Sequence, residues 1–404
     1  MRVLQLCHKI PYPPSDGGSI AMHQITRGLL DKGIHVKVLA LAPGRGLSPR
    51  PEPGVDYVQE TGFESFPVNT SIRPIPAFVN LFTKGSYNVS RFYSRPFARR
   101  LAELLKKETF DIIQLEGLYL TPYIPVIRDH TGSTLLFRSH NIEHYIWARM
   151  ARVATNPLKK AYLKFLANRL KAYEMETIHQ VDGLVAISSL DQRFFEKNGF
   201  AQPAITIPVA ANPAFYKDAP KKVEPGSVFH LGSMDWRPNM EGLGWFLENV
   251  WPLVQEKNPH LRFFLAGKNI PPSFNQYQGQ QIIIDGEVDD AADYMASREL
   301  MVVPLRSGGG MRVKIIEGMA AGKAIVSTSI GAEGIQCTHG ENIILADTPS
   351  EMAASVLSCF EDRTIMERTG AAARQFALDH HNIDPMMDTL IAFYISYLKE
   401  TRDE

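Results

Sequence analysis

GGGMRVKIIEGMAAGKAIVSTSIGAEGI, at residues 308–335, is the stretch that decides how this chain is interpreted. Three glycines precede an apolar segment with one acid, Glu317, and Gly322 marks the end of a helix. The AIVST that follows predicts a short buried strand. Successive glycine amides ahead of a helix form an anion-binding nest, and Arg312 and Lys314 beside it suit a diphosphate. The stretch therefore predicts a phosphate-sugar cradle at the edge of a parallel sheet, with a plain surface loop as the alternative.

Short apolar runs alternate with helical segments in two successive blocks of the chain. The runs of the first block are 3–7, 35–41, 110–117, 133–141 and 183–188, and those of the second are 227–233, 261–267, 281–286, 300–305, 324–329 and 342–346. Such runs suit parallel sheets that are covered by helices on both faces. We expect an α/β fold with two Rossmann-like, doubly wound domains that face a cleft, which is the default ligand site.

The composition of the segment between the blocks suggests where the domains meet. Residues 211–227, ANPAFYKDAPKKVEPGS, are rich in proline, lysine and glycine, as linkers are. We therefore expect a first domain over 1–210, a second over 211–380, and a C-terminal helix within 381–404 that packs back on the first domain.

Composition narrows the class of protein. The 404 residues are 45% hydrophobic, enough to bury two cores, and no apolar run is long enough to span a membrane. RVLQLC at the N-terminus predicts a strand and is too short for the apolar core of a secretory signal. Three scattered cysteines without metal-ligand spacing favour a reducing, cytoplasmic location.

The net charge of the chain is zero, but the charged residues are unevenly distributed along it. Residues 1–212 hold 26 Lys and Arg against 17 Asp and Glu, a surplus of nine that the rest of the chain balances. Much of the surplus lies in 84–107 and 149–171, and the second of these stretches contains no acid. At helical spacing, Leu158, Tyr162, Leu166 and Leu170 fall on one face, with lysines opposite. Such a helix suits an anionic membrane surface or a solvated basic face, and both interpretations stay open.

Polar residues follow the runs of the first block. Gly17 and Gly18 lie between the first strand and the first helix, where the backbone can approach an anion or simply turn. Glu116 ends a strand as a candidate acceptor contact or a solvated acid. RSHNIEH (138–144) ends another, and its His140 could exchange protons near neutral pH. A helix cap built by Asn141 is the structural alternative for this segment.

The second block offers two further candidates. Arg237 precedes a helix and could reach a phosphate as a forked donor, or be an ordinary surface arginine. DGEVDD (285–290) ends a strand, where its backbone around Val288 and its acids could meet a base or ribose, or be solvated. The fingerprint and acid of a dinucleotide site are absent, which argues against an NAD enzyme.

Taken together, these motifs resemble the GT-B glycosyltransferases, specifically the large retaining family 4 group, over nearly the whole chain. The resemblance rests on Gly17–Gly18, on His140–Asn141–Glu143, on 181–195, on 208–216 and on EGMAAGKAIVST. It is nearest to a subgroup in which GGG-M-R-x-K replaces the usual acidic loop.

The chain departs from the common family pattern at two places. The family's second donor-site glutamate corresponds to Glu317, but the first would fall on Gly309. The usual arginine and lysine after the first strand of the second domain would fall on Ser233 and Pro238. The cations of this chain are instead Arg237, Arg312 and Lys314.

The resemblance implies a metal-independent, retaining transfer from a nucleotide-diphosphate sugar, with no resident cofactor. It assigns the ribose to Glu317, the diphosphate to the three cations and the transferred sugar to His140. It implies substrate contacts at Gly17, Gly18, Glu116, Asn141, Glu143, Val288, Gly308, Gly309, Gly310 and Met311. The expected acceptor is a glycan or lipid-linked molecule of bacterial envelope or exopolysaccharide synthesis, near the inner membrane face, with no nucleic acid involved. A non-catalytic nucleotide-sugar-binding protein or another enzyme on this fold, such as a sugar epimerase, remains an alternative.

Overall fold

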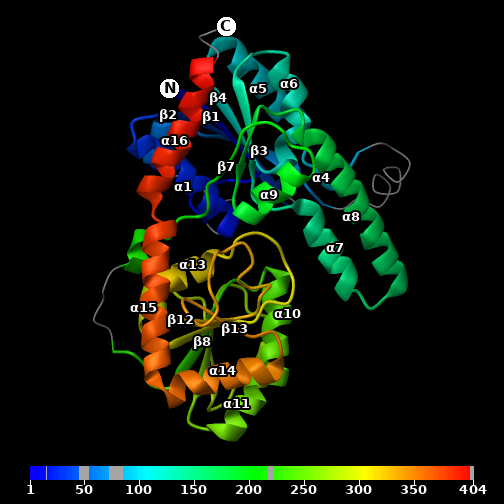
Figure 1. The fold of residues 1–404 in the computed structure, drawn as a ribbon. Coiled ribbons are helices and arrows are strands. Elements are labelled where there is room, and N and C mark those ends of the chain that lie inside the picture. The colour runs from blue at the N-terminus through cyan, green and yellow to red at the C-terminus, as the bar shows by residue number, and fades with distance from the viewer. Residues whose placement is uncertain (15, 45–53, 72–84, 217–221, 401–404) are drawn as a thin grey trace. The chain divides into compact units, whose positions relative to one another are not determined.

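The computed structural model describes residues 1–14, 16–44, 54–71, 85–216 and 222–400. The chain divides into two compact units, Met1–Pro208 with Ile383–Glu404, and Val209–Asn382. Figure 1 shows both units, and each is described by itself. Within the described ranges, every helix is too short or too polar to cross a bilayer.

In its described residues the first unit contains a seven-stranded parallel sheet of order β3-β2-β1-β4-β5-β6-β7. Its strands are β1 (Arg2–Cys7), β2 (His35–Gly44), β3 (Glu64–Asn69), β4 (Ile112–Glu116), β5 (Thr134–Ser139), β6 (Gly183–Ala186) and β7 (Ala204–Thr206). Its helices are α1 (Gly17–Asp31), α2 (Val55–Thr61), α4 (Tyr87–Ser90), α5 (Arg95–Lys107), η1 (Leu118–Tyr123), α6 (Ile124–Arg128), α7 (Glu143–Val153), α8 (Pro157–Ile178), α9 (Ser189–Lys197) and α16 (Ile383–Glu400). The five predicted runs of the first block are confirmed as strands, whereas β3 and β7 were not predicted.

The described part of the second unit repeats this topology with a six-stranded parallel sheet of order β10-β9-β8-β11-β12-β13. Its strands are β8 (Ser227–Leu231), β9 (Arg262–Ala266), β10 (Ile282–Gly286), β11 (Leu300–Val303), β12 (Ala324–Ser327) and β13 (Ile344–Leu345). Its helices are η2 (Pro213–Tyr216), α10 (Arg237–Trp245), η3 (Phe246–Val250), α11 (Trp251–Lys257), η4 (Pro272–Tyr277), α12 (Ala291–Ala296), α13 (Val313–Ala320), α14 (Pro349–Glu361) and α15 (Arg363–His380). The six predicted runs of this block are confirmed as strands.

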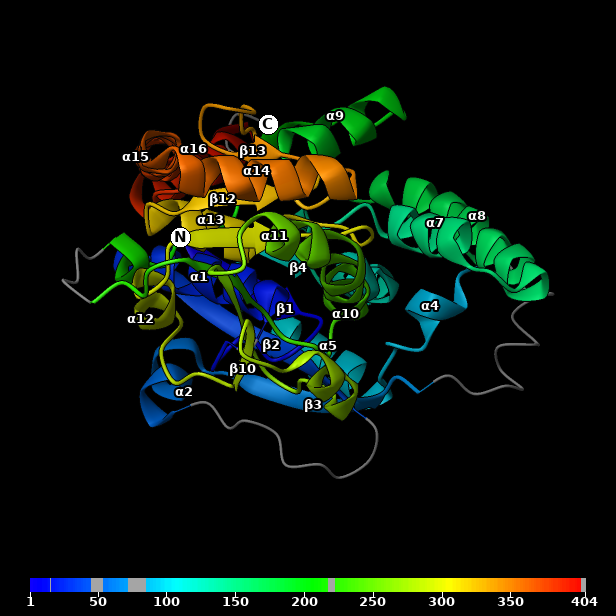
Figure 2. The same cartoon turned by 90° about the horizontal axis from the view of Figure 1, so that it is seen from below.

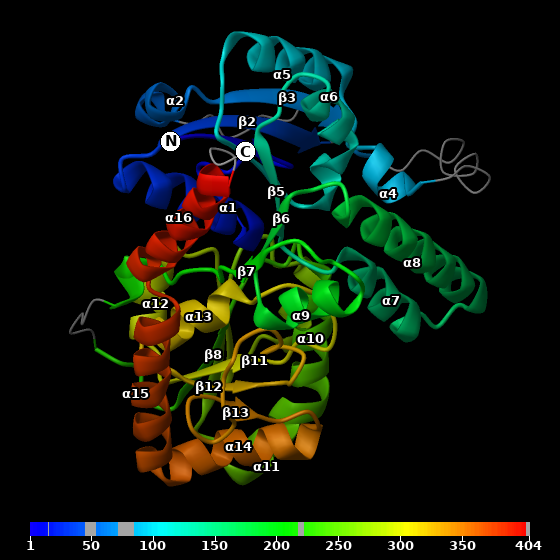
Figure 3. The ribbon, with the colours of Figure 1, turned by 45° about the horizontal axis from the view of Figure 1, so that its top comes forward.

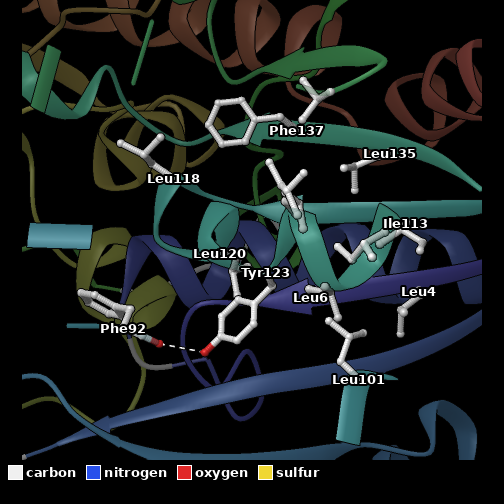
Figure 4. Close-up of a cluster of buried hydrophobic side chains, with 14 of the residues drawn as sticks. Leu4, Leu6, Phe92, Leu101, Ile113, Leu118, Leu120, Tyr123, Leu135 and Phe137 are labelled. Carbon is white, nitrogen blue, oxygen red and sulfur yellow. Dashed lines mark hydrogen bonds between the residues drawn. The ribbon is translucent and has the colours of Figure 1, made fainter. Parts of the chain in front are cut away.

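Both sheets reverse their strand order at one point, between β1 and β4 in the first unit and between β8 and β11 in the second. The loops after these strands diverge at such a switch point, which leaves backbone groups accessible to a ligand. The hydrophobic core of the first unit consists of buried aliphatic and aromatic side chains, several of which Figure 4 shows. Within it the Tyr123 hydroxyl donates to the Phe92 carbonyl oxygen at 2.9 Å, so this buried polar atom is satisfied.

The C-terminal helix α16 belongs to the first unit and packs against α1. A Cβ at Gly28 of α1 would come within 2.5 Å of Met387, so glycine permits the close crossing of the two helices. Buried Tyr394 donates its hydroxyl proton to Gln114 at the centre of the sheet. This hydrogen bond between α16 and β4 fixes the position of the helix along the sheet.

Three local expectations are corrected by the structure. Helix α1 begins at Gly17, because Asp16 and Ser19 form a capping box, so the glycine pair lies inside the first helical turn. Phe215 of the expected linker 211–227 is buried in the second unit's core; residues 217–221 of that segment lie outside the described residues. The expected apolar face of α8 is divided in the structure, because Leu158 and Tyr162 are exposed whereas Leu170 is buried together with Leu163 and Ala167.

Candidate functional site

The glycine loop of the second unit connects β11 to α13 at the switch point. Gly308 and Gly310 have φ values of 106° and 73°, which lie in the left-handed region. A Cβ at Gly308 would also lie 2.7 Å from Cζ2 of Trp236. Two of the three glycines are thus required by backbone conformation.

Arg312 shapes this loop from within. Its side chain is 4% exposed and its Nη1 donates to the carbonyl oxygens of Gly309 and Gly310. In a trans peptide the N–H points opposite to the C=O, so the amides of Gly310 and Met311 are directed away from Arg312. The guanidinium also stacks over Trp236, with Cζ 5.2 Å from the ring centroid. Arg312 was predicted to face a diphosphate directly, whereas in this structure it orients the amides of the loop.

The side chain of Lys314 extends from α13 to the loop that follows β8. Its Nζ donates to Oδ1 of Asn239 at 2.9 Å and to Nε2 of His230 at 3.1 Å. His230 Nδ1 donates to the Val302 carbonyl oxygen at 2.8 Å, which leaves Nε2 as the acceptor for Lys314. A Cβ at Gly232 would lie only 2.3 Å from Nζ. A cation from α13 is therefore located just after the first strand of this unit. The family pattern would place an arginine and a lysine there, at the positions that Ser233 and Pro238 occupy in this chain.

Burial changes the ionisation of this group. Desolvation, together with the neighbouring charge of Arg312, lowers the pKa of Lys314 to about 7. Burial raises the pKa of Glu317 to about 7, against the opposing effect of Lys314. The pKa of His230 is well below its usual value because the ring is buried and lies beside Lys314. Lys314 and Glu317 are thus poised to gain or lose charge when a ligand replaces water.

Two further predicted residues of the second unit are Arg237 and Val288. Arg237 begins α10 with its side chain 60% exposed, and it pairs with Glu241 at 2.6 Å. The Glu241 carboxylate also accepts from the Ser307 hydroxyl at 3.2 Å, so it connects Arg237 to the start of the glycine loop. Val288 is partly buried against the core. Two of the acids near Val288 have structural partners: Asp285 accepts from the Tyr294 hydroxyl, and Asp290 accepts from the Asp293 amide in the first turn of α12.

Glu116 is fully buried at the switch point of the first unit. Its carboxylate accepts from Gln5 and Gln114 at 2.8 and 2.6 Å, and pairs with Arg138 at 3.2 Å and His140 at 2.6 Å. Burial by itself raises the pKa of Glu116, but Arg138, His140 and Gln114 outweigh it and lower the pKa to about 2. The predicted acceptor contact is replaced by a positioning role, since the protein's own donors occupy both oxygens.

His140 and His8 meet beside Glu116. Glu116 accepts from Nε2 of His140, while Nδ1 of His8 donates to the Glu116 carbonyl oxygen at 2.6 Å. The two rings are edge to face, with centroids 5.7 Å apart. Burial lowers the pKa of both rings, that of His8 to about 3, so each is neutral near pH 7 with one nitrogen held by Glu116. His8 is a candidate residue that the sequence motifs do not indicate.

Glu143 lies at the start of α7, close to a second acid. Its carboxylate accepts from the Tyr119 hydroxyl at 2.8 Å and the Asn141 amide at 3.3 Å. Burial raises the pKa of Glu143 to about 7, and Glu174 adds to the effect. Glu174 of α8 accepts from the Glu143 amide at 3.0 Å and from His144 Nδ1 at 2.6 Å. The helix N-terminus is thus capped by Glu174, and the alternative of a cap built by Asn141 is wrong.

Gly17 and Gly18 lie in the first turn of α1, close to the Lys9–Asp16 ion pair. Lys9 Nζ lies 2.6 Å from Oδ1 of Asp16 and would lie 2.7 Å from a Cβ at Gly18. A lysine is thereby held over the helix N-terminus, a position where anions are favoured. Across the described ranges, His, Cys, Asp and Glu side chains form no group of three suited to a metal ion.

Sequence comparisons match both parts of the chain to glycosyltransferases. Residues 15–215 match the family described as Glycosyltransferase Family 4, and residues 225–362 match Glycosyl transferases group 1. A phosphatidyl-myo-inositol mannosyltransferase of Mycolicibacterium smegmatis is 25% identical over 390 residues, which cover 93% of this chain and 88% of that protein. A protein of the cps region of Klebsiella pneumoniae is 24% identical over 294 residues, 70% of this chain and 74% of that protein.

Solved structures share the fold. Sucrose-phosphate synthase from Thermosynechococcus elongatus aligns with a TM-score of 0.72 at 14% identity, covering 99% of this chain and 100% of that one. Anabaena HepE in complex with UDP aligns with a TM-score of 0.65 at 14% identity, covering 98% and 100%. With two doubly wound parallel sheets and these family matches, the chain belongs to the GT-B glycosyltransferases, with a Family 4 first part and a group 1 second part.

Proposed function

We propose that this glycosyltransferase moves a sugar from a nucleotide-diphosphate sugar to a glycan or lipid-linked acceptor, with retention of configuration and without a metal. The observation that carries the proposal is the environment of Lys314. Its ammonium is bonded to the neutral acceptors His230 and Asn239, at a switch point and beside a glycine loop. Burying a cation among neutral partners is unfavourable, so the site favours an anion such as a diphosphate.

Each group of the second unit has a role in this proposal. Lys314, the amides of Gly310 and Met311, and the N-terminus of α13 stabilise the charge that develops on the departing diphosphate. A pre-organised donor of this kind contributes a factor of about 10² to 10³ in rate. Glu317 accepts hydrogen bonds from the ribose hydroxyls, and Arg312 keeps the loop amides in place. The backbone near Val288 is the proposed contact for the base, and Arg237 is the outermost cation.

The first unit provides the contacts to the sugar and acceptor. His140 is proposed to contact the transferred sugar through the ring edge that Glu116 does not hold, with Asn141 and Glu143 adjoining it and Gly17 and Gly18 near the acceptor. Neither Glu116 nor Glu143 is suited to covalent catalysis, because the protein's own donors bind their oxygens. Same-face attack, with a donor phosphate oxygen taking the acceptor proton, is therefore the favoured route.

The relatives support the acceptor class. The mycobacterial relative is named for a phosphatidylinositol acceptor, and the Klebsiella relative for a cps region. HepE has been solved with UDP and with UDP-glucose. Envelope or exopolysaccharide synthesis at the inner face of the membrane is the corresponding proposal for this chain.

Calorimetric titration with UDP, GDP, ADP and dTDP, each without metal, tests the donor class. We expect one nucleotide to bind with micromolar affinity, and Glu317→Ala and Lys314→Ala each to weaken it at least about tenfold. Absence of binding by all four nucleotides would overturn the proposal.

A non-catalytic, nucleotide-sugar-binding protein is the second candidate. It is favoured by Gly309, which stands where the family has its first donor-site glutamate. Binding of a nucleotide sugar without transfer or hydrolysis, over a panel of lipid-linked and glycan acceptors, would select this candidate.

A further inference from the structure

A network of polar side chains is buried inside the first unit, on strands β1, β4 and β5 and on helices α1 and α16. Figure 2 shows β1 between β2 and β4. Six members of the network are at most 1% exposed: Gln5, Thr26, Gln114, Glu116, Arg138 and Tyr394. Buried charged groups, even when paired, are seldom more stabilising than apolar side chains of similar volume. Such a network is therefore expected where it positions a functional group.

Glu116 joins the network to His140. Oε1 of Glu116 accepts from the amides of Gln5 and Gln114, and Oε2 accepts from Arg138 and His140. These four donors fix the plane of the carboxylate, and the carboxylate in turn holds the Nε2–H group of His140. The other ring nitrogen, Nδ1, is then the unprotonated one. A change in the orientation of Glu116 therefore changes how His140 presents its ring.

Two hydroxyl groups orient the amides that bind Glu116. The Thr26 hydroxyl donates to Oε1 of Gln5 at 2.6 Å, and the Tyr394 hydroxyl donates to Oε1 of Gln114. Because each amide oxygen accepts from a hydroxyl, each amide directs its NH₂ group to the carboxylate. Thr26 lies in α1, whereas Tyr394 lies in the C-terminal helix, 280 residues after Gln114.

The packing of α16 holds Tyr394 in place. This helix lies beside α1, as Figure 3 shows. Burial raises the pKa of Tyr394, and the charge of Glu116 adds to the effect, so the hydroxyl keeps its proton and remains a donor near neutral pH. Without this hydroxyl, Oε1 of Gln114 would be a buried acceptor that has lost its donor. Gln114 would then rotate more freely, and its hydrogen bond to Glu116 would weaken.

We propose that Tyr394 is a positioning residue for His140, acting through Gln114 and Glu116. The hydroxyl orients the Gln114 amide, the amide holds the Glu116 carboxylate, and the carboxylate fixes the tautomer and the direction of the imidazole. The C-terminal helix thereby contributes to the sugar contact, although Tyr394 is fully buried. The inference rests on the proposed function for the role of His140, but the state of the ring can be measured without any substrate.

The state of the His140 ring in the ligand-free full chain tests the proposal. In wild type labelled with ¹⁵N-histidine, NMR is expected to show a protonated Nε2 and an unprotonated Nδ1, and His140→Gln identifies the two signals. Tyr394→Phe keeps the ring and removes the hydroxyl, and Gln114→Met removes the amide. Each variant should move the two nitrogen signals toward each other, because the second tautomer becomes populated.

Tyr397→Phe is the matched control. It removes a second buried tyrosine hydroxyl from the same helix, one that donates to the Asp182 carbonyl oxygen at 2.8 Å. The His140 signals of this control should be those of wild type, and circular dichroism should show that all variants are folded. Unchanged His140 signals in Tyr394→Phe, or equal changes in Tyr397→Phe, would overturn the proposal.

Turnover with the identified donor provides the second measurement. Tyr394→Phe should lower turnover about three- to tenfold, the effect of one hydrogen bond, while nucleotide affinity stays within about twofold. In the Gln114→Met background the same substitution should cause no further loss, because Tyr394 acts through Gln114. An equal further loss in that background would show that Tyr394 acts by packing alone, which contradicts the proposal.

The two measurements separate this inference from the proposed function. His140 signals that respond to Tyr394→Phe, in a protein whose wild type binds none of the four nucleotides, would refute the donor proposal and support the positioning of His140. Nucleotide binding and transfer by wild type, with full turnover and unchanged His140 signals in Tyr394→Phe, would do the reverse.

Discussion

Nζ of Lys314 lies 3.1 Å from Nε2 of His230, so a buried cation of the second unit is held by a neutral ring nitrogen. The Val302 carbonyl fixes the tautomer of His230, and Asn239 supplies the second acceptor. This arrangement leaves the charge of Lys314 uncompensated by its direct partners. The charge of Lys314 therefore destabilises the folded protein but favours binding of an anionic ligand.

Replacing Lys314 with methionine should weaken binding of the preferred nucleoside diphosphate at least about tenfold, because a charge-assisted contact is lost. The same variant should stabilise the ligand-free protein at pH 7 by roughly 1–3 kcal/mol, since it removes a poorly compensated buried charge. Chemical denaturation and calorimetry measure the two effects. Lys257→Met, an exposed position in the same unit, is the control and should change neither. A destabilised Lys314→Met protein would contradict this account of the site.

Affinity for the diphosphate should decrease as pH rises above about 7. The pKa of Lys314 is about 7 in the ligand-free protein, so only below that value is the ammonium fully charged before binding. A bound diphosphate raises this pKa, and binding above pH 7 must therefore take up a proton. Calorimetry in buffers of different ionisation enthalpy measures the uptake. Lys314→Arg should bind without this uptake, since guanidinium stays charged, and Glu317→Gln should retain it. Equal proton uptake by wild type and Lys314→Arg would exclude Lys314 as its source.

The pH dependence of stability has a predictable sign at Lys314. Its folded pKa lies below the ordinary lysine value of 10.5, so between pH 7 and 10.5 the unfolded chain binds the proton that the folded chain has released. The contribution of this group therefore becomes more favourable to folding as pH rises through that range. The difference in unfolding free energy between Lys314→Met and wild type should shrink from pH 7 to pH 10. A difference that grows would contradict the depressed pKa.

Glu116→Gln should destabilise the protein by about 3–5 kcal/mol, because it leaves Arg138 buried without its counter-ion. Glu116 has a pKa near 2, so its contribution is present above about pH 4.5 and is lost as pH falls towards 2. Glu64→Gln is the matched control: its pKa is also about 2, owing first to Arg100, but its side chain is partly exposed. Its loss should be about 1 kcal/mol or less by chemical denaturation. Similar losses in both variants would show that burial does not govern the Glu116 cluster.

His140→Ala should lower turnover at least about tenfold while nucleotide affinity stays within about twofold, if His140 contacts the transferred sugar. His8→Ala should lower turnover less, because His8 reaches this region beside His140 and is held by a backbone oxygen. His35→Ala, on an exposed position of the same unit, serves as the control. Steady-state kinetics with the identified donor measure turnover. Loss of nucleotide affinity in His140→Ala would place this histidine in a different role.

Much of this protein was predictable from sequence because the signals are local. The hydrophobic periodicity identified the eleven runs as strands, and the three glycines identified the loop at 308–310. Both signals come from residues that are neighbours in the sequence. The family motifs identified which loops carry the candidate residues. They could not specify what each polar side chain would bond to.

Those partners were decided by tertiary structure. Arg312 turns inward to its own loop, Lys314 reaches a histidine 84 residues away, and Glu116 is enclosed by donors from three other strand positions and a following loop. Helix α8 shows the same limit: of the face that its periodicity defines, Leu158 and Tyr162 are exposed and Leu170 is buried, because periodicity cannot say which residues α7 covers. Sequence thus determined the elements and the chemistry available at their ends, while packing determined which charges are buried, paired or exposed, because burial and partner distance depend on residues far apart in the chain.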